Sequence, residues 1–245
     1  MPDSHDPFRR HPELRDKIKD PKDSFFNTFD INAMVPVLLE NNLPVDWWYT
    51  DQEREAIRAD ALSGHNGDLW VFAYGSLMWD PAFQFSDLRR ATAHGYQRQF
   101  IAKDVKGARG TPEQPGLMAA LDIGTRCDGI LLKIDADRIE SETEILFRRE
   151  MIAPGYQTHF ISCECDDQAI TAMTFLANHD SDFICAELTR DDKVSLLATG
   201  EGFLGTSLEY ISNIVAQLHT LGINDHDVVN LMEDAIAFQQ KNAPA

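Results

Sequence analysis

Residues 69–77 read LWVFAYGSL, a short apolar segment that runs directly into a Gly-Ser turn. Its first five residues are apolar and include aromatic and β-branched types, which predicts a buried β-strand that ends at Gly75. The simplest interpretation of the turn is an ordinary strand ending. However, a strand that stops in Gly-Ser leaves backbone N–H groups without sheet partners, and with the Ser76 hydroxyl these can hold a carboxylate. We therefore treat Tyr74, Gly75, Ser76 and Leu77 as candidate substrate-binding residues.

The pattern around this segment predicts an α+β (mixed) fold, a small mixed β-barrel or sheet with flanking helices. Strand candidates cluster between residues 69 and 177, and the last two alternate cleanly between faces. A regular strand–helix alternation is absent, which argues against a doubly wound sheet. The expected strands are 69–73, 96–103, 117–121, 129–134, 156–164 and 169–177. The expected helices are 51–63, 135–151, 206–222 and one that begins near 225. Capping boxes are expected at 50–53 and 206–209.

The chain divides near residue 68 in composition. Residues 1–30 are polar and charged with four prolines, and an apolar stretch follows at 31–43. We therefore expect residues 1–67 to be an N-terminal extension, partly helical and laid over the surface, and residues 68–245 to be the domain that carries the motifs.

The net charge limits the choice of partners. The 245 residues carry 22 Lys+Arg against 40 Asp+Glu, a net charge of −18. A surface this acidic repels nucleic-acid phosphates and anionic membranes, so we expect neither as a partner. An anionic small molecule would need a binding site with locally placed positive charge. We take a monomer as the default state.

The cysteines and the apolar segments predict a cytoplasmic protein without a structural metal. Cys163 and Cys165 lie two apart in an alternating segment, so both should lie on one strand face as small hydrophobes. A zinc site would need a second ligand pair at suitable spacing, and none is visible. The first 20 residues lack the apolar stretch of a secretory signal, and no apolar run of 18 residues is present.

Residues 109–116, RGTPEQPG, are a second candidate for binding. An arginine can hold a carboxylate through two parallel hydrogen bonds, and the surrounding Gly and Pro residues would keep the loop rigid. The alternative is a solvated loop arginine. We keep Arg109 as a candidate substrate-binding residue.

The third candidate is Glu150, near the end of the helix expected over 135–151. It follows Leu146 by four residues and Phe147 by three, so it should lie close to the apolar helix face. A carboxylate on an inward face is either paired with a cation or held in a pocket with a raised pKa, and the second case is typical of a general base. The alternative is a surface glutamate paired with Arg148 or Arg149.

Taken in order along the chain, these segments resemble the ChaC family of glutathione-specific γ-glutamylcyclotransferases. The resemblance covers the chain from about residue 69 to its C-terminus. It implies a small mixed barrel with flanking helices and a pocket at one end. The segments that carry it are WVFAYGSLMW at 70–79, GYQRQF at 95–100, RGTPEQPG at 109–116, RE at 149–150 leading to GY at 155–156, and EY at 209–210.

The resemblance also implies an activity and roles for individual residues. It implies release of 5-oxoproline and cysteinylglycine from glutathione, with Glu150 as the catalytic acid/base and no cofactor or metal. Tyr156 and Tyr210 fall on motif tyrosines, and residues 74–77 fall on the loop that cradles the substrate. Residues 153–156, APGY, differ from the Gly-Gly-Tyr of many relatives, so the turn before Tyr156 should be longer or stiffer.

Two alternatives remain open from the sequence. One is a cyclotransferase for other γ-glutamyl amines or peptides, against which the 109–116 loop argues. The other is a non-catalytic acidic regulator or adaptor, against which the intact Glu150 and the intact 74–77 turn argue.

Overall fold

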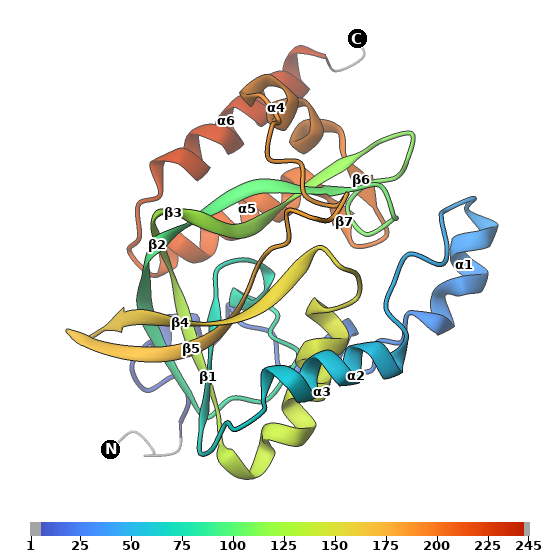
Figure 1. Ribbon diagram of the computed structural model, residues 1–245. Helices are drawn as coiled ribbons and strands as arrows, with labels where there is room; N and C mark the ends of the chain where they lie inside the picture. The colour runs from blue at the N-terminus through green and yellow to red at the C-terminus, as the bar shows by residue number, and fades with distance from the viewer. Residues whose placement is uncertain (1–5, 243–245) are drawn as a thin grey trace.

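A closed five-stranded β-barrel forms the centre of the protein, whose computed structural model describes residues 6–242 (Figure 1). The strand order is β1-β3-β2-β4-β5, and a parallel pairing of β1 with β5 closes the barrel. The remaining neighbours in that order pair antiparallel, and of these β2–β3 and β4–β5 are consecutive in the chain. This confirms the expected α+β barrel with flanking helices. The strands are β1 Leu69–Ala73, β2 Asp87–Asp104, β3 Gly116–Ile134, β4 Tyr156–Cys165 and β5 Gln168–Ala177.

The long β2–β3 pair is where the strand predictions fell short. The strands expected at 117–121 and 129–134 are one strand, and β2 begins nine residues before the expected 96. Residues 87–95 and 122–128 are mostly polar and carry no clean apolar alternation, yet both belong to the ladder: residues 87–91 pair with 129–133, and residues 92–94 pair with 126–128. Ladder hydrogen bonds satisfy the backbone whatever the side chains are, so a polar outer stretch of a hairpin gives no periodic signal.

The expected helices form close to their expected bounds, and two further helices were not predicted. The capping box before α2 is confirmed, because Thr50 accepts from the Glu53 N–H and Glu53 accepts from the Thr50 N–H. Of the two hydrogen bonds in the capping box expected before α5, only one forms. Thr206 accepts from the Glu209 N–H, but the Glu209 carboxylate lies 3.5 Å from an Arg109 nitrogen instead. The helices are α1 Val35–Glu40, α2 Asp51–Ala61, α3 Ile139–Glu150, α4 Arg190–Thr199, α5 Ser207–Thr220 and α6 His226–Lys241, of which α1 and α4 were not predicted.

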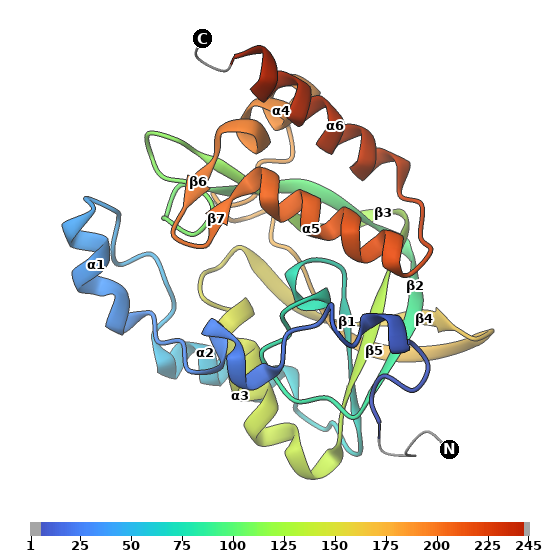
Figure 2. The ribbon, with the colours of Figure 1, turned by 180° about the vertical axis from the view of Figure 1, so that it is seen from behind.

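Helices α4, α5 and α6 pack together, with α5 and α4 against β3, whereas α2 and α3 lie together on another side of the barrel (Figures 1 and 2). Short elements complete the fold. They are the two-stranded hairpin β6 Glu201–Gly202 and β7 Gly205–Thr206, and the 3-10 turns η1 Pro12–Leu14, η2 Pro21–Asp23, η3 Phe25–Asn27, η4 Asn32–Met34, η5 Ser76–Met78 and η6 Ala136–Arg138.

The segment before β1 is fastened to this framework by buried contacts. Leu14 and Ile18 join the main core beneath α5 and η5. The Lys19 N–H donates to the Trp79 carbonyl at 2.8 Å, and Gln217 donates to the Lys17 carbonyl at 2.7 Å. Figure 2 shows this stretch, in dark blue, crossing the barrel toward α3 before the chain reaches α1. The arm therefore covers one face of the barrel, and its status as a separate extension stays a prediction.

Within residues 6–242, no helix combines the length and the apolar character that a bilayer crossing requires. Cys163 and Cys165 are both buried on β4, as their alternation predicts. Burial raises the pKa of the Cys163 thiol to about 12, so it stays protonated and packs as a hydrophobe.

Candidate active site

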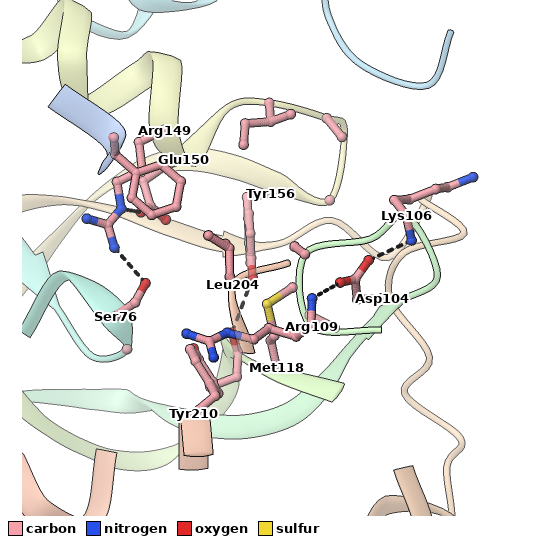
Figure 3. A pocket seen from close by; sticks show the side chains of 18 of the residues that line it. Ser76, Asp104, Lys106, Arg109, Met118, Arg149, Glu150, Tyr156, Leu204 and Tyr210 are labelled. Carbon is pink, nitrogen blue, oxygen red and sulfur yellow. Dashed lines mark hydrogen bonds and ion pairs between the residues drawn. The ribbon is translucent and has the colours of Figure 1, made fainter. Parts of the chain in front are cut away.

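One cavity of about 470 Å³ lies at an end of the barrel, where β1 runs into η5 and where α3 ends (Figure 3). Side chains from α5, from β4 and from the loop after β2 complete its walls. The structure thus brings together residues that are up to 136 positions apart in the sequence. All eight predicted site residues line this cavity: Tyr74, Gly75, Ser76, Leu77, Arg109, Glu150, Tyr156 and Tyr210.

Glu150 is the last residue of α3, and its side chain is 16% exposed toward the cavity. Burial raises the pKa of the Glu150 carboxyl above its ordinary value, while the Arg149 guanidinium beside it acts in the opposite direction. Arg149 Nε donates to Glu150 Oε1 at 2.9 Å. The carboxylate is therefore held in a fixed position, largely removed from bulk water, with a proton affinity above that of a surface glutamate.

Arg149 was not among the predicted site residues, yet it links three parts of the site. Its Nη2 donates to Ser76 Oγ at 2.8 Å, and its Nη1 lies 3.6 Å from a carboxylate oxygen of the buried Asp80. The Phe26 ring lies 4.5 Å from its guanidinium carbon. The sequence offered a pairing with Arg149 only as the alternative for a surface glutamate, whereas here the paired carboxylate lines the cavity. The pairing forms where the helix ends.

The strand-ending turn is a single 3-10 turn, η5, whose first two residues line the cavity. The N–H groups of Met78 and Trp79 donate back to the carbonyls of Gly75 and Ser76 at 2.9 and 3.1 Å. The N–H groups of Ser76 and Leu77 form no hydrogen bond with any residue between 6 and 242. Two backbone donors at the strand end thus lack a partner among these residues, as expected for a strand that stops in Gly-Ser, and their use by a ligand stays a prediction.

Two contacts fix the position of this turn. Arg98, which is buried, donates from Nε to the Tyr74 carbonyl at 2.7 Å. At Gly75 an added Cβ would lie 3.0 Å from the Tyr210 hydroxyl, so the tyrosine or the turn would have to move by a few tenths of an ångström. The glycine therefore allows the α5 tyrosine to approach the turn directly.

The three tyrosines form neutral walls of the cavity. Burial raises the pKa values of Tyr74 and Tyr156 well above the ordinary range and that of Tyr210 to about 12, so all three keep their protons at neutral pH. Tyr74 donates to the Phe175 carbonyl at 2.8 Å and Tyr156 to the Ala119 carbonyl at 3.2 Å. The APGY turn leaves Tyr156 in the cavity lining.

Arg109 enters from the loop after β2, with 13% of its side chain exposed. Its Nη1 donates to the Thr206 carbonyl at 3.3 Å, and its guanidinium carbon lies 5.7 Å from the Tyr210 ring centre. Asp104 organises this loop, because its carboxylate accepts from the N–H groups of Lys106, at 2.7 Å, of Arg109 and of Gly110, at 3.0 Å (Figure 3). The rigidity of this loop was expected from its Gly and Pro residues, and the contribution of Asp104 was not predicted.

The charge of the lining is opposite to that of the whole chain. Five cationic and three acidic side chains line the cavity, against a net charge of −18 overall. This is the local positive charge that an anionic ligand requires in an acidic protein. The cationic residues are Lys19, Lys103, Lys106, Arg109 and Arg149, and the acidic ones are Asp80, Asp104 and Glu150.

The closed barrel with a buried carboxylate over a strand-ending turn defines a protein with the γ-glutamylcyclotransferase fold. A solved structure of a yeast protein, described as a gamma-glutamyl cyclotransferase specific to glutathione, has this architecture. It superposes with a TM-score of 0.67 over 73% of this chain and 100% of that chain, at 19% identity. At that identity, the likeness shows the fold.

The chain belongs to the family described as ChaC-like protein, whose model matches residues 69–237. A protein of Escherichia coli (strain K12) named glutathione-specific gamma-glutamylcyclotransferase is 31% identical over 205 residues, which are 80% of this chain and 86% of that protein. A Homo sapiens protein named glutathione-specific gamma-glutamylcyclotransferase 1 is 27% identical over 164 residues, 65% of this chain and 73% of that protein. This family assignment confirms the resemblance seen in the sequence.

Proposed function

We propose that this protein cleaves glutathione by cyclising its γ-glutamyl group to 5-oxoproline, which releases cysteinylglycine. The observation that carries the proposal is Glu150, a carboxylate held in the cavity with its pKa raised by burial, opposite the free N–H groups of the Ser76 turn. The names of the E. coli and human relatives support glutathione as the substrate. The local positive charge of the cavity suits a substrate that carries two carboxylates and one ammonium group.

Glu150 would act as both general base and general acid. The α-ammonium group of the substrate cannot attack while it carries its third proton, and Glu150 accepts that proton. The free amine then attacks the γ-carbonyl carbon, and the bond between that carbon and the cysteine nitrogen breaks. Glu150 returns this proton to the departing nitrogen. The attacking nitrogen loses a second proton as it becomes the lactam N–H, and the released amino group of cysteinylglycine takes up that proton, so the carboxylate ends as it began.

The remaining site residues would hold the substrate in a folded shape. Ring closure is intramolecular, and good orientation is worth roughly 7–11 kcal/mol in favourable systems. The N–H groups of Ser76 and Leu77 can receive either the α-carboxylate or the oxyanion that develops on the γ-carbonyl. Arg109, Tyr156 and Tyr210 form the opposite walls. We further propose that the enzyme is a cytoplasmic monomer.

The test uses purified protein, reduced glutathione and quantification of both products. We expect equimolar 5-oxoproline and cysteinylglycine, and a loss of about 10²–10⁴-fold in kcat for Glu150→Gln. The matched control is Glu144→Gln on the same helix, whose side chain is 65% exposed and outside the cavity. It should retain full activity. A folded wild type that releases no 5-oxoproline from glutathione would refute the proposal and favour other γ-glutamyl amines or peptides as substrates. Failure with those as well would favour an adaptor. Size-exclusion chromatography of the same sample reports the oligomeric state.

A further inference from the structure

Besides the residues around Glu150, the cavity has a part lined by large apolar side chains. The polar cysteinylglycine portion of glutathione would not cover this apolar surface. We call this part of the cavity the aromatic annex. Its rings fall into two groups. The first comes from residues 25–29, around η3, and from the β6–β7 hairpin. The second comes from the loops around residues 47 and 183. The annex residues are Phe25, Phe26, Phe29, Trp47, Phe183 and Phe203, all in the lining of the same cavity as Glu150.

Ring contacts hold each group of the annex together. Phe25 lies 5.2 Å from Phe29 and 6.3 Å from Phe203, and Trp47 lies 5.7 Å from Phe183, measured between ring centres. Phe25 and Phe203 are nevertheless 44% and 47% exposed at the cavity mouth. Large apolar side chains gathered at a cavity mouth are typical of a surface that covers an apolar group of a ligand.

The annex begins next to the reacting centre. Phe26 lies against the guanidinium of Arg149, at 4.5 Å from its central carbon, and Arg149 donates to Glu150 at 2.9 Å. In glutathione the cysteine side chain branches from the carbon attached to the departing nitrogen. A group attached to the cysteine sulfur therefore branches from the substrate only a few bonds from the nitrogen that Glu150 protonates. The annex begins at this point of the cavity.

The polar end of the same substrate also has a partner at the annex. Lys106 Nζ lies 5.9 Å from the ring centres of both Trp47 and Phe183. A glycine carboxylate directed toward this ammonium group would place the cysteine side chain between the two groups of rings. A bare thiol would leave most of that apolar surface uncovered, whereas a benzyl or longer alkyl group would cover it, at roughly 25 cal/mol per Å² of apolar area removed from water.

We propose that the annex binds the apolar substituent of S-conjugated glutathione, so that thioether conjugates are substrates at least as good as glutathione. This inference rests on the proposed cyclisation and names its substrate class more closely. The step is the same: the α-amine forms the ring, the bond to the cysteine nitrogen breaks and Glu150 moves the proton. The products are 5-oxoproline and S-substituted cysteinylglycine, with no oxidant or reductant. Four of the six rings precede residue 69, where the family match begins, and three of these precede it by more than 35 residues.

The experiment compares kcat/KM for reduced glutathione, S-methylglutathione, S-benzylglutathione and γ-glutamylphenylalanine, with 5-oxoproline measured in each case. We expect S-benzylglutathione to equal or exceed glutathione and to exceed S-methylglutathione. A smaller kcat/KM for S-benzylglutathione than for glutathione would overturn the inference and leave the proposed function standing. A higher kcat/KM for γ-glutamylphenylalanine than for S-benzylglutathione would mean that the annex binds an amino-acid side chain. That result would overturn the inference that it binds a thioether substituent. No release from any substrate would refute the proposed function itself.

Variants test whether the annex causes the preference. Trp47→Ala should lower the ratio of the S-benzylglutathione and glutathione kcat/KM values by tenfold or more, and Phe203→Ala, at the exposed hairpin, gives the same test if Trp47→Ala fails to fold. The matched control is Phe160→Ala, an aromatic residue that is 41% exposed on β4 and outside the cavity. It should leave the ratio unchanged. An unchanged ratio in both annex variants would overturn the inference.

Discussion

The inner and outer halves of the cavity are built on different principles. In the inner half, each polar group is held by another: Glu150 by Arg149, Arg149 by Ser76, and the Tyr74 carbonyl by Arg98. In the outer half, the contacts are ring against ring at 5.2–6.3 Å between centres. Hydrogen bonds fix atoms to a few tenths of an ångström, whereas ring contacts tolerate repacking.

This difference separates chemistry from substrate choice. Proton transfer fails when a carboxylate moves by an ångström, so its supports must be directional. Apolar recognition depends on area and tolerates some misfit, so flexible rings suffice. The inner half should therefore respond sharply to a single altered atom, and the outer half should respond mainly through the choice of substrate.

Removal of Arg149 should give the largest effect after Glu150 itself. We expect Arg149→Met to lower kcat/KM for glutathione by about 10–100-fold at pH 7, because Glu150 loses the group that positions it. Arg149 also opposes the burial that raises the pKa of Glu150. Without it, the pKa rises further, and the base is deprotonated only at higher pH. The acid limb of the kcat/KM profile, which should already lie above the ordinary glutamate pKa of 4.5, should therefore move to higher pH.

The measurement is a pH–rate profile of both proteins, with Arg138→Met as the control. Arg138 is 51% exposed at the other end of the same helix, and its replacement should change neither limb. An acid limb that stays in place or moves to lower pH in Arg149→Met would show that Arg149 does not set the pKa of the base.

A single methyl group at Gly75 should cost about tenfold in kcat/KM. The added Cβ would lie 3.0 Å from the Tyr210 hydroxyl, so either the turn or the tyrosine must shift. The direct check is a double-mutant cycle with Tyr210→Phe, which removes the clashing oxygen. If the clash is the cause, Gly75→Ala should cost little in the Tyr210→Phe background. Additive losses would place the effect in the backbone of the turn instead.

Local pattern in the sequence predicted the inner barrel but not its long polar hairpin. Residues 69–73 are a continuous apolar run and residues 169–177 alternate, so both carry a clear signal. Residues 87–95 and 122–128 mix a few buried residues, such as Leu88, Ala93 and Cys127, with many polar ones, and give no clean pattern. Helix α2 was predicted because its capping box lies within four consecutive residues.

The same distinction applies to the site. Residues with a local signature, such as Ser76 at a strand end and Glu150 near an apolar helix face, were predicted to be candidates, and their roles remain proposals. Arg98, Arg149 and Asp104 were missed because their function lies in partners that the fold supplies. Arg98, for example, donates to Asp225 across 127 positions at 2.6 Å. No spacing rule connects such residues before the chain is folded.

The smallest effect on catalysis is expected where the segment before β1 is anchored, at Leu14. This side chain is buried in the main core and does not line the cavity. We expect Leu14→Ala to lower the stability by about 2–5 kcal/mol, which corresponds to roughly 4–20 °C in Tm for a chain of this size. The kcat for glutathione should change by less than about threefold at temperatures where the variant is folded, because the hydrogen bonds among Glu150, Arg149 and Ser76 are made by residues that follow β1. Lys17→Ala, an exposed neighbour, serves as the control and should shift stability by no more than about 0.5 kcal/mol.

An unchanged Tm for Leu14→Ala would mean that the segment is not docked in solution. A large loss of kcat in a folded variant would mean that the segment supports the chemistry as well as the annex, and the division between the two halves of the cavity would then fail.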